Sequence, residues 1–392
     1  MAYFPGFNTR AVHSGEFMIP EIGNVTTPIF QTATFEHPNR SRNPTIDRPR
    51  NAPFLYSRLG NPTVQALEEK YASLEGSDFS LAFPSGMAAI SSSILAMNNA
   101  GSSMLSVQEL YGETYGFLSS GVRKYGMGTE FIGVDSLNSL EFDPSEKSLV
   151  YLESIINPTM KVADIAGISR ICKENNVPLV VDATFASPLN QKPLRLGASL
   201  VMHSGTKYIS GHSDMMLGLI GTSDSGIFKS IYDMRKSLGP SVDPMQAFLG
   251  ARGMKTLGLR VERQNRVAME VANYLEQHRE VQHVLYPGLE SSPYRQIAER
   301  NLEGFGGMLS FELKGGIEAA RKLMKHLQIP RIAASLGGVE SLVSLPVETS
   351  HADVPAGKRS EMGISNGLIR FSCGIEDPED VIADLEKGLS AV

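Results

Sequence analysis

Short apolar runs alternate with amphipathic stretches in the part of the chain that begins at residue 61. Helical spacing is clearest at 61–76, where apolar side chains recur every three or four residues before a glycine. The apolar runs read as buried strands: FSLAF (79–83), SMLSV (103–107), TEFIGV (129–134), SLVYLE (148–153), PLVVD (178–182), SLVMH (199–203) and MLGLIG (216–221). This alternation predicts an α/β fold whose large domain, 61–252, contains a mainly parallel seven-stranded sheet covered on both faces.

The pattern changes beyond Arg252. Helical stretches at 256–278, 316–327 and 377–390 alternate with two strand-like segments, GFGGMLSFEL and GLIRFSCG. We therefore expect a smaller C-terminal α+β domain over residues 253–392.

The first sixty residues read as an irregular, extended N-terminal arm. Four prolines and four arginines occur together there, and such proline density blocks regular helices and central strands: Pro38, Pro44, Pro49, Pro53, Arg40, Arg42, Arg48 and Arg50. Two interpretations are open at this point, a solvated loop or an arm that packs on a neighbouring subunit.

Composition narrows the function classes. The chain has 392 residues and a net charge of -6, which disfavours a broad nucleic-acid-binding surface. No stretch approaches the ~20 uninterrupted apolar residues of a membrane helix, and no secretory leader is recognisable. Two cysteines without a CxxC spacing, and scattered histidines, give no disulfide framework and no metal site. We expect a cytoplasmic protein without nucleic-acid, membrane or metal partners.

Unusual polar residues stand where the predicted strands end. Ser85 and Gly86 lie between a strand and a helix, a place where free backbone N–H groups bind phosphate, although most such turns are only caps. Asp182 closes PLVVD, and Lys207 follows SLVMH. Ligands of open α/β sheets bind beyond the carboxyl ends of the strands. A lysine, a carboxylate and a phosphate-binding turn at one sheet edge are what pyridoxal 5′-phosphate (PLP) requires.

The chain resembles the Cys/Met-metabolism family of PLP enzymes, which includes cystathionine γ-lyase, cystathionine γ-synthase and methionine γ-lyase. The resemblance covers nearly the whole length and implies the PLP-dependent transferase fold type I. It is carried by YSRLGNPT (56–63), FPSGMAAI (83–90), LYGETY (110–115), LESIINPTMKVADI (152–165), VVDATFASP (180–188), HSGTKYISGHSD (203–214), GFGGMLSFEL (304–313), SLGGVESL (335–342) and GISNGLIRFSCGIED (363–377).

The resemblance implies a role for each matching residue at the cofactor. Lys207 would hold PLP as an imine (a Schiff base) and then move protons, and Asp182 would keep the pyridine nitrogen protonated. Tyr111 would stack on the ring and assist at the leaving group, although a tyrosine in isolation is more often a core or interface residue. The remaining cofactor-binding positions would be Gly86 and Met87 through backbone amides, and Thr184, Ser204 and Thr206.

The resemblance also implies contacts with a second subunit and with substrate. Tyr56 and Arg58 would reach the phosphate in the adjacent subunit, so that the protein is a dimer, doubled to a homotetramer. Arg370, with Ser335 and Asn157, would bind the α-carboxylate of an amino-acid substrate, because the guanidinium fork matches a carboxylate. A structural ion pair is the alternative for Arg370.

Three positions depart from the family pattern. Cystathionine-handling relatives usually carry glutamate where this chain has Ala334, and methionine γ-lyases typically carry cysteine where it has Glu113. Ala183 stands where relatives often have asparagine, a change of small expected effect. We hypothesise that Glu113 supplies the missing carboxylate and receives a distal substrate amine.

The implied reaction is γ-elimination or γ-replacement in transsulfuration, within methionine metabolism and cysteine biosynthesis. Candidate substrates are cystathionine, methionine or homocysteine, and an O-acylhomoserine, with a cystathionine γ-lyase or γ-synthase favoured. The alternatives are a methionine γ-lyase or an O-acetylhomoserine sulfhydrylase. More remote are a PLP aminotransferase of the same fold and an inactive paralogue that acts as a scaffold.

Overall fold

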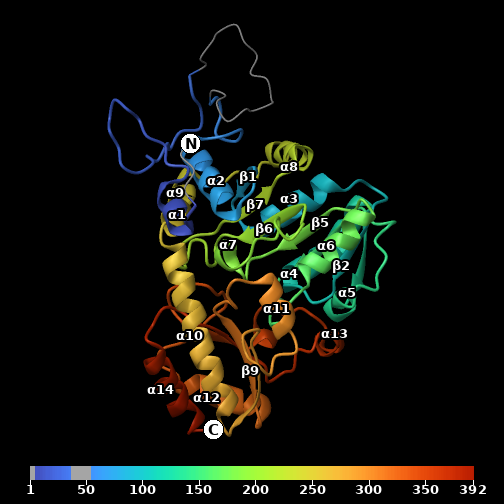
Figure 1. Ribbon diagram of the computed structural model, residues 1–392, viewed down its shortest axis with the longest axis vertical. Helices are drawn as coiled ribbons and strands as arrows, with labels where there is room; N and C mark the ends of the chain where they lie inside the picture. The colour runs from blue at the N-terminus through green and yellow to red at the C-terminus, as the bar shows by residue number, and fades with distance from the viewer. Residues whose placement is uncertain (1–4, 37–53) are drawn as a thin grey trace.

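The computed structural model describes residues 5–36 and 54–392, and within them the chain forms two sheets (Figure 1). The proline- and arginine-rich part of the expected arm, residues 37–53, lies outside the described residues. In strand order, the first sheet consists of β1 (Phe79–Phe83), β7 (Gly218–Thr222), β6 (Leu200–Ser204), β5 (Leu179–Asp182), β4 (Val150–Glu153), β2 (Ser103–Val107) and β3 (Gly128–Ile132).

Every strand predicted for this sheet is confirmed, with ends within two residues of the expected ones. Neighbouring strands pair in parallel except at β7, which runs antiparallel to both β1 and β6. The parallel strands therefore share one carboxyl edge, and the residues that follow β1, β2, β4, β5 and β6 meet there.

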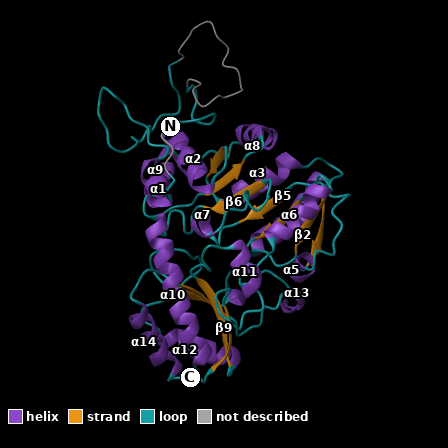
Figure 2. Ribbon diagram, in the orientation of Figure 1, coloured by secondary structure: helices purple, strands orange, loops and turns teal. Residues whose placement is uncertain are grey.

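Helices cover both faces of the first sheet (Figure 2). They are α2 (Pro62–Glu75), α3 (Gly86–Met97), α4 (Gly112–Gly116), α5 (Val134–Asn138), α6 (Ile165–Glu174), α7 (Ser187–Asn190), α8 (Ser225–Leu238) and α9 (Pro244–Met254), with a π-helical turn η1 (Phe117–Gly121) and a 3-10 turn η2 (Val122–Tyr125) after α4. Local signals set their ends: the Asn61 side chain caps α2 and Asp224 caps α8, while Gly76 and Gly239 end the same helices in the left-handed conformation.

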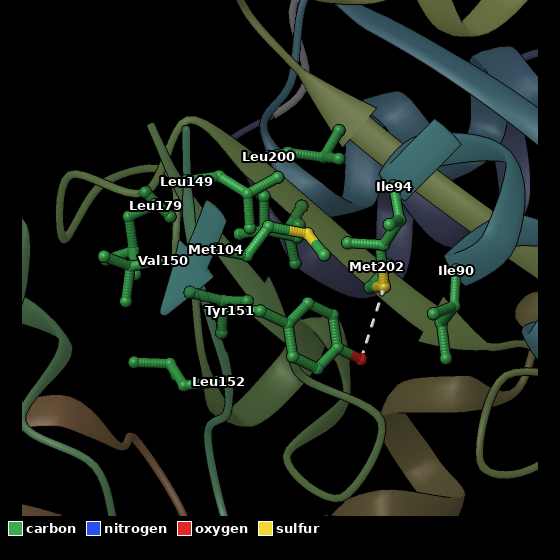
Figure 3. Close-up of a cluster of buried hydrophobic side chains, with 14 of the residues drawn as sticks. Ile90, Ile94, Met104, Leu149, Val150, Tyr151, Leu152, Leu179, Leu200 and Met202 are labelled. Atoms are coloured by element: carbon green, nitrogen blue, oxygen red, sulfur yellow. Dashed lines mark hydrogen bonds between the residues drawn. The ribbon is translucent and has the colours of Figure 1, made fainter. Parts of the chain in front are cut away.

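The core between α3 and the sheet shows why this half of the chain is rigid. Ile90 and Ile94 of α3 lie over the central strands together with Met104, Tyr151 and Met202, all of them buried (Figure 3). The Tyr151 hydroxyl donates to the Met202 sulfur at 3.8 Å, so its polar end also has a partner. Close packing of this kind fixes the strand ends, and with them the side chains at the carboxyl edge.

The second sheet has the strand order β10 (Arg331–Ile332), β11 (Leu342–Ser344), β12 (Ile369–Ser372), β9 (Met308–Leu313) and β8 (Val281–Leu285). It is antiparallel except between β10 and β11. Its helices are α10 (Leu257–Gln277), α11 (Arg295–Asn301), α12 (Gly316–His326), α13 (Ala356–Glu361) and α14 (Pro378–Leu389), with a 3-10 turn η3 (Pro346–Glu348). The predicted smaller α+β region is thus confirmed, and α10 runs from α9 to its sheet (Figure 1).

The N-terminal stretch is more regular than its sequence suggested. Residues Phe7–His13 form helix α1, which packs on α2 and α10 and buries Ala11. Seven residues are too few for an apolar periodicity to predict this helix from the sequence. A contact with α2 holds it in place, since Lys70 donates to the carbonyl of Ala11 at 2.9 Å. Within the described part of the chain, no helix is both long and apolar enough to cross a lipid bilayer.

Candidate active site

A cavity of about 670 Å³ lies at the carboxyl edge of the first sheet, between that sheet and the second one. Most of the residues that the sequence singled out line it. From the first sheet and its loops these are Gly86, Met87, Tyr111, Asn157, Asp182, Thr184, Ser204, Thr206 and Lys207; from the second region they are Ala334, Ser335 and Arg370. Residues up to 285 positions apart in the sequence, from Ser85 to Arg370, therefore line one cavity.

Lys207 follows β6, and its amine reaches across the cavity. Nζ donates to the Ser335 hydroxyl at 2.8 Å. Burial, and then the positive charge of Arg370, lower the pKa of Lys207 to about 8. A substantial fraction of this amine is therefore neutral near pH 8, and only the neutral form is a nucleophile or a base.

Asp182 ends β5 and is held by the residue two positions further on. The backbone N–H and the hydroxyl of Thr184 both donate to Asp182 Oδ1, at 2.9 and 2.5 Å. The Thr184 oxygen in turn accepts the backbone N–H of Ser204 at 2.8 Å, which joins the ends of β5 and β6. Burial raises the pKa of Asp182, while the Thr184 hydrogen bonds oppose that rise. A cationic group in the cavity would restore its ionisation.

The start of α3 and the end of β6 approach closely in the same cavity. A Cβ on Gly86 would lie only 3.0 Å from Cβ and 3.1 Å from Oγ of Ser204, so a larger residue would require Ser204 to shift slightly. The Ser85 side chain caps the helix through the N–H of Ala88 at 3.1 Å. The amides of Gly86 and Met87 precede that bond in the first turn, where backbone N–H groups have no intrahelical acceptor. Amides and a hydroxyl are thus gathered as an anion site.

Arg370 lies on β12 and is 4% exposed. Its Nη1 donates to Asn157 Oδ1 at 3.2 Å and its Nη2 to the Ser335 carbonyl at 3.1 Å. Among residues 5–36 and 54–392, no acidic side chain forms an ion pair with it, so the structural ion pair considered from the sequence does not occur there. Burial lowers the pKa of Arg370 to about 10, and the group is still cationic at neutral pH. A buried guanidinium without a counter-ion beside a cavity favours binding of an anionic ligand group.

Ser335 joins the amine and the guanidinium. Its hydroxyl accepts from Lys207 and its carbonyl accepts from Arg370. The backbone φ of this residue is +96°, a value that residues with a side chain rarely adopt. Such strain persists where the surroundings over-determine the conformation, as at ligand sites.

Tyr111 lines the cavity, whereas Glu113 does not. The Tyr111 ring is 39% exposed and lines it. Burial and then the charge of Glu113 raise the pKa of Tyr111, whereas Arg370 lowers it. Glu113 itself is exposed in the first turn of α4 and is not among the lining residues.

Tyr56 and Arg58 do not line this cavity. Their side chains contact each other, with the Arg58 guanidinium carbon 5.1 Å from the centre of the Tyr56 ring, and the ring is 43% exposed. They lie instead in a second hollow with residues 31–33, 239 and 241–244.

Sequence reasoning missed two acidic residues of the cavity. Glu153 ends β4 in register with Asp182, so the argument that singled out a carboxylate at the end of an apolar strand applied to it equally. Glu348 lies in η3 at the cavity lining, and its carboxylate also pairs with Arg321 at 2.7 Å. Nothing in the local pattern around Glu348 signals a site, because a loop from the second region brings it there.

A mixed seven-stranded sheet with a ligand cavity at its carboxyl edge, facing a second smaller sheet, defines a class of α/β enzymes. Residues 8–390 match a family described as Cys/Met metabolism PLP-dependent enzyme. The chain belongs to this family, so that its cofactor is PLP and its substrates are small amino acids of sulfur metabolism.

Similar proteins within the family differ in their names. L-methionine gamma-lyase of Fusobacterium nucleatum subsp. polymorphum is 38% identical, covering 99% of this chain and 98% of that protein. Cystathionine gamma-lyase of Dictyostelium discoideum is 38% identical over 97% of each. The structure of cystathionine gamma synthase from Xanthomonas oryzae pv. oryzae, in complex with aminoacrylate and cysteine, superposes with a TM-score of 0.93 at 35% identity over 99% of both chains. Similarity at this level identifies the family and leaves the reaction open.

The cavity fits PLP by the chemistry of its donors. An amine of lowered pKa suits an aldehyde, a carboxylate at a strand end suits a ring nitrogen, and a helix start beside the Ser204 hydroxyl suits a phosphate. The absence of a side chain at Gly86 lets the start of α3 approach Ser204, which brings the Ser204 hydroxyl close to the first helix amides.

Proposed function

We propose that the protein catalyses γ-elimination or γ-replacement on a sulfur amino acid or an O-acylhomoserine, as a cystathionine γ-lyase or γ-synthase. The observation that carries the proposal is the Lys207–Ser335–Arg370 chain of hydrogen bonds facing Asp182 across one cavity. An amine of lowered pKa thus lies near a cation that suits a substrate carboxylate, and both line one cavity with a carboxylate that suits the ring nitrogen.

The cofactor would be held from the first sheet. Lys207 would bind its aldehyde and Asp182 its ring nitrogen, while Thr184 orients Asp182 through two hydrogen bonds. The phosphate would lie at the amides of Gly86 and Met87. Ser204 and Thr206 would complete that anion site from the end of β6 and the residues after it. When bound, PLP accepts the electrons released as a proton leaves the substrate carbon next to the amine.

The substrate would be oriented from the second sheet. Arg370 presents a guanidinium fork to the α-carboxylate, and Asn157 and the Ser335 carbonyl fix the plane of that fork. Two parallel bonds to one carboxylate fix direction as well as distance, which determines the carbon that faces Lys207.

Lys207 and Tyr111 would be the residues that transfer protons. The amine of Lys207, once released by the incoming substrate amine, is neutral often enough to remove a proton, because burial and Arg370 lower its pKa. The Ser335 hydroxyl gives it a defined resting position. Tyr111 lies over the same cavity and would pass a proton to the departing group from its hydroxyl.

We further propose that the active site is completed by a second subunit. Tyr56 and Arg58 lie in the N-terminal arm (1–60), away from this chain's cavity and partly exposed, which suits contact with the cofactor phosphate of an adjacent protomer. The assembly would be a homotetramer of two such dimers. In each protomer the cofactor would be held by residues 61–252 and the substrate carboxylate by residues 253–392.

A reducing, cytoplasmic location accompanies this proposal. Cys172 and Cys373 are both buried free thiols, the state that a reducing compartment maintains. Burial raises the pKa of Cys172 to about 12, so its thiol is unreactive near neutral pH.

A methionine γ-lyase or an O-acetylhomoserine sulfhydrylase is the second candidate. Ala334 lines the cavity beside Ser335, at the position where cystathionine-handling relatives carry glutamate. The missing charge favours a substrate without a distal ammonium. If Glu113 supplies that charge instead, cystathionine remains the better substrate.

Incubation of the PLP-loaded protein with cystathionine, methionine and O-acylhomoserine tests the proposal. Lyase activity yields 2-oxobutyrate and ammonia, whereas γ-replacement with cysteine or homocysteine as the added thiol yields a thioether. Amino transfer to an added 2-oxo acid, or no turnover of any of these compounds, would contradict it. A matched incubation of Lys207→Ala identifies background chemistry of free PLP.

A further inference from the structure

The carboxylate of Glu153 connects two loops of the active site. Its Oε1 accepts the backbone N–H of Tyr111 at 2.7 Å, and its Oε2 accepts the backbone N–H of Asn157 at 3.3 Å. The residue is only 6% exposed. One loop follows β2 and the other follows β4, so no regular secondary structure fixes the distance between them.

Each of these loops carries a residue that faces the cavity. Tyr111 presents its ring there, and the Asn157 amide oxygen accepts a hydrogen bond from Arg370 at 3.2 Å. A single carboxylate thus holds the proposed stacking ring with one oxygen. With its other oxygen Glu153 holds Asn157, which accepts a hydrogen bond from Arg370, the residue proposed to bind the substrate carboxylate.

We propose that Glu153 is a positioning residue, whose two oxygens set the distance and angle between the Tyr111 ring and the Asn157–Arg370 pair. The inference rests on the proposed function, because it assigns those groups to cofactor and substrate. As a consequence, the Tyr111 ring and the carboxylate-binding Arg370 keep a fixed position relative to each other. Loss of the Glu153 carboxyl group disturbs both at once.

The electrostatic surroundings of Glu153 disfavour the ionised form of its carboxyl group. Burial, then the charge of Asp182 and more weakly that of Glu109, raise the pKa of Glu153 to about 8, while the two N–H groups lower it. The hydroxyl of Tyr151 also lies within electrostatic range, from the strand to which Glu153 belongs. A glutamine would fill the same space without these penalties. However, its NH₂ would face one of the two N–H donors, so only one of the bonds could form.

The chain offers a matched control in Asp384 of α14. This carboxylate is 4% exposed and also accepts two backbone N–H groups, both at Oδ2, from Gln328 at 2.8 Å and Ile329 at 2.9 Å. It belongs to the second region and does not line the cavity. Asp384→Asn therefore replaces a buried carboxylate that binds backbone with a neutral amide, without touching the site.

The experiment compares Glu153→Gln and Asp384→Asn as PLP-loaded proteins. Three properties are measured: the visible circular dichroism of the bound cofactor, the affinity for glycine from its spectral change, and the melting temperature. For Glu153→Gln we expect altered dichroism and glycine binding weakened about threefold to tenfold, the usual effect of losing one hydrogen bond. For Asp384→Asn we expect a lower melting temperature with unchanged dichroism and glycine affinity.

Unchanged dichroism and glycine affinity in Glu153→Gln would overturn the proposal, as would equal changes in both variants. These readouts need no turnover, so a protein that binds glycine but fails the γ-elimination and γ-replacement assays contradicts only the proposed function. If Glu153→Gln does not fold, Glu153→Asp serves instead. It keeps the carboxyl group, but its side chain is one methylene too short to span both N–H groups, and the same changes are expected.

Discussion

The two walls of the cavity are built in different ways. On one wall, Asp182 and Ser204 stand at the ends of parallel strands, with Lys207 directly after one of them. On the other wall only Arg370 belongs to a strand, and the remaining lining residues, 334–336 and 348–350, come from loops and a 3-10 turn.

The difference separates what the family shares from what distinguishes its members. The strand-end wall carries the cavity-lining residues that the family resemblance assigns to PLP, whereas Tyr56 and Arg58 lie outside the cavity. Of the three departures, Ala334 lies on the opposite wall, Glu113 lies in α4 outside the lining, and Ala183, a change of small expected effect, directly follows β5. A packed sheet edge holds groups in fixed places and suits a common cofactor, whereas loops tolerate substitution and can alter substrate preference.

Substitution of Lys207 is the strongest test of the strand-end wall, and it should have the largest effect. Lys207→Ala removes the amine and is expected to lower turnover by at least the 10²- to 10⁴-fold typical of a lost general base. Borohydride reduction of the PLP-loaded protein, followed by peptide mass spectrometry, should place the label on residue 207 in the wild-type protein.

A second buried lysine provides the control. Lys192 has a pKa lowered to about 8 by burial, as Lys207 has, but it is not among the cavity-lining residues. Label at Lys192, or colour and activity retained by Lys207→Ala, would contradict the assignment.

The opposite wall is tested at Arg370. Among the described residues, Arg370 and Lys207 are the cations that line the cavity. Arg370→Leu removes one of them, so we expect kcat/KM to fall about 10²- to 10³-fold, mainly through KM. The fall in kcat/KM should occur only for substrates that carry an α-carboxylate. The wild-type protein should prefer an amino acid over the corresponding amine that lacks a carboxyl group, and the variant should have lost most of that preference. An undiminished preference in Arg370→Leu would mean that another group binds the carboxylate.

The two walls interact through charge, which gives a pH dependence. Unfolded Lys207 has a pKa near 10.5, whereas burial and Arg370 lower it to about 8 in the folded chain. Between these values the unfolded state binds more protons. The stability of the PLP-free protein should therefore gain a contribution as the pH rises from about 8 to 10.5. Reconstitution with PLP should accelerate through pH 8, because the neutral amine is the reactive form.

Two variants locate the source of that dependence. Lys207→Met should remove the contribution of residue 207 to the stability profile. Arg370→Leu should move the midpoint of reconstitution to higher pH, since a positive neighbour is lost. A midpoint in the wild-type protein near 10.5 would show that the cavity does not perturb the amine.

The same contrast explains how much of the structure could be predicted. The strands of the first sheet have strong apolar patterns, and their shared edge made the meeting of Asp182, Ser204 and Lys207 predictable from topology alone. The place of Arg370 came from the family resemblance, because the packing of two sheets is not encoded in local periodicity. Glu348 was missed for that reason, whereas Glu153 carried a readable signal at the end of β4.

The smallest expected effect concerns substrate choice at the loop wall. Glu113→Gln should lower the turnover ratio of cystathionine to methionine only a few-fold, because the carboxylate is exposed and an exposed charge pair contributes about 0–1 kcal/mol. Glu348→Gln is the comparison, since Glu348 lines the cavity but its carboxylate is shared with Arg321. A ratio that changes in Glu348→Gln and stays constant in Glu113→Gln would transfer the distal-amine role to the 3-10 turn. The loop wall would then select substrate from the second region alone, without a contribution from α4.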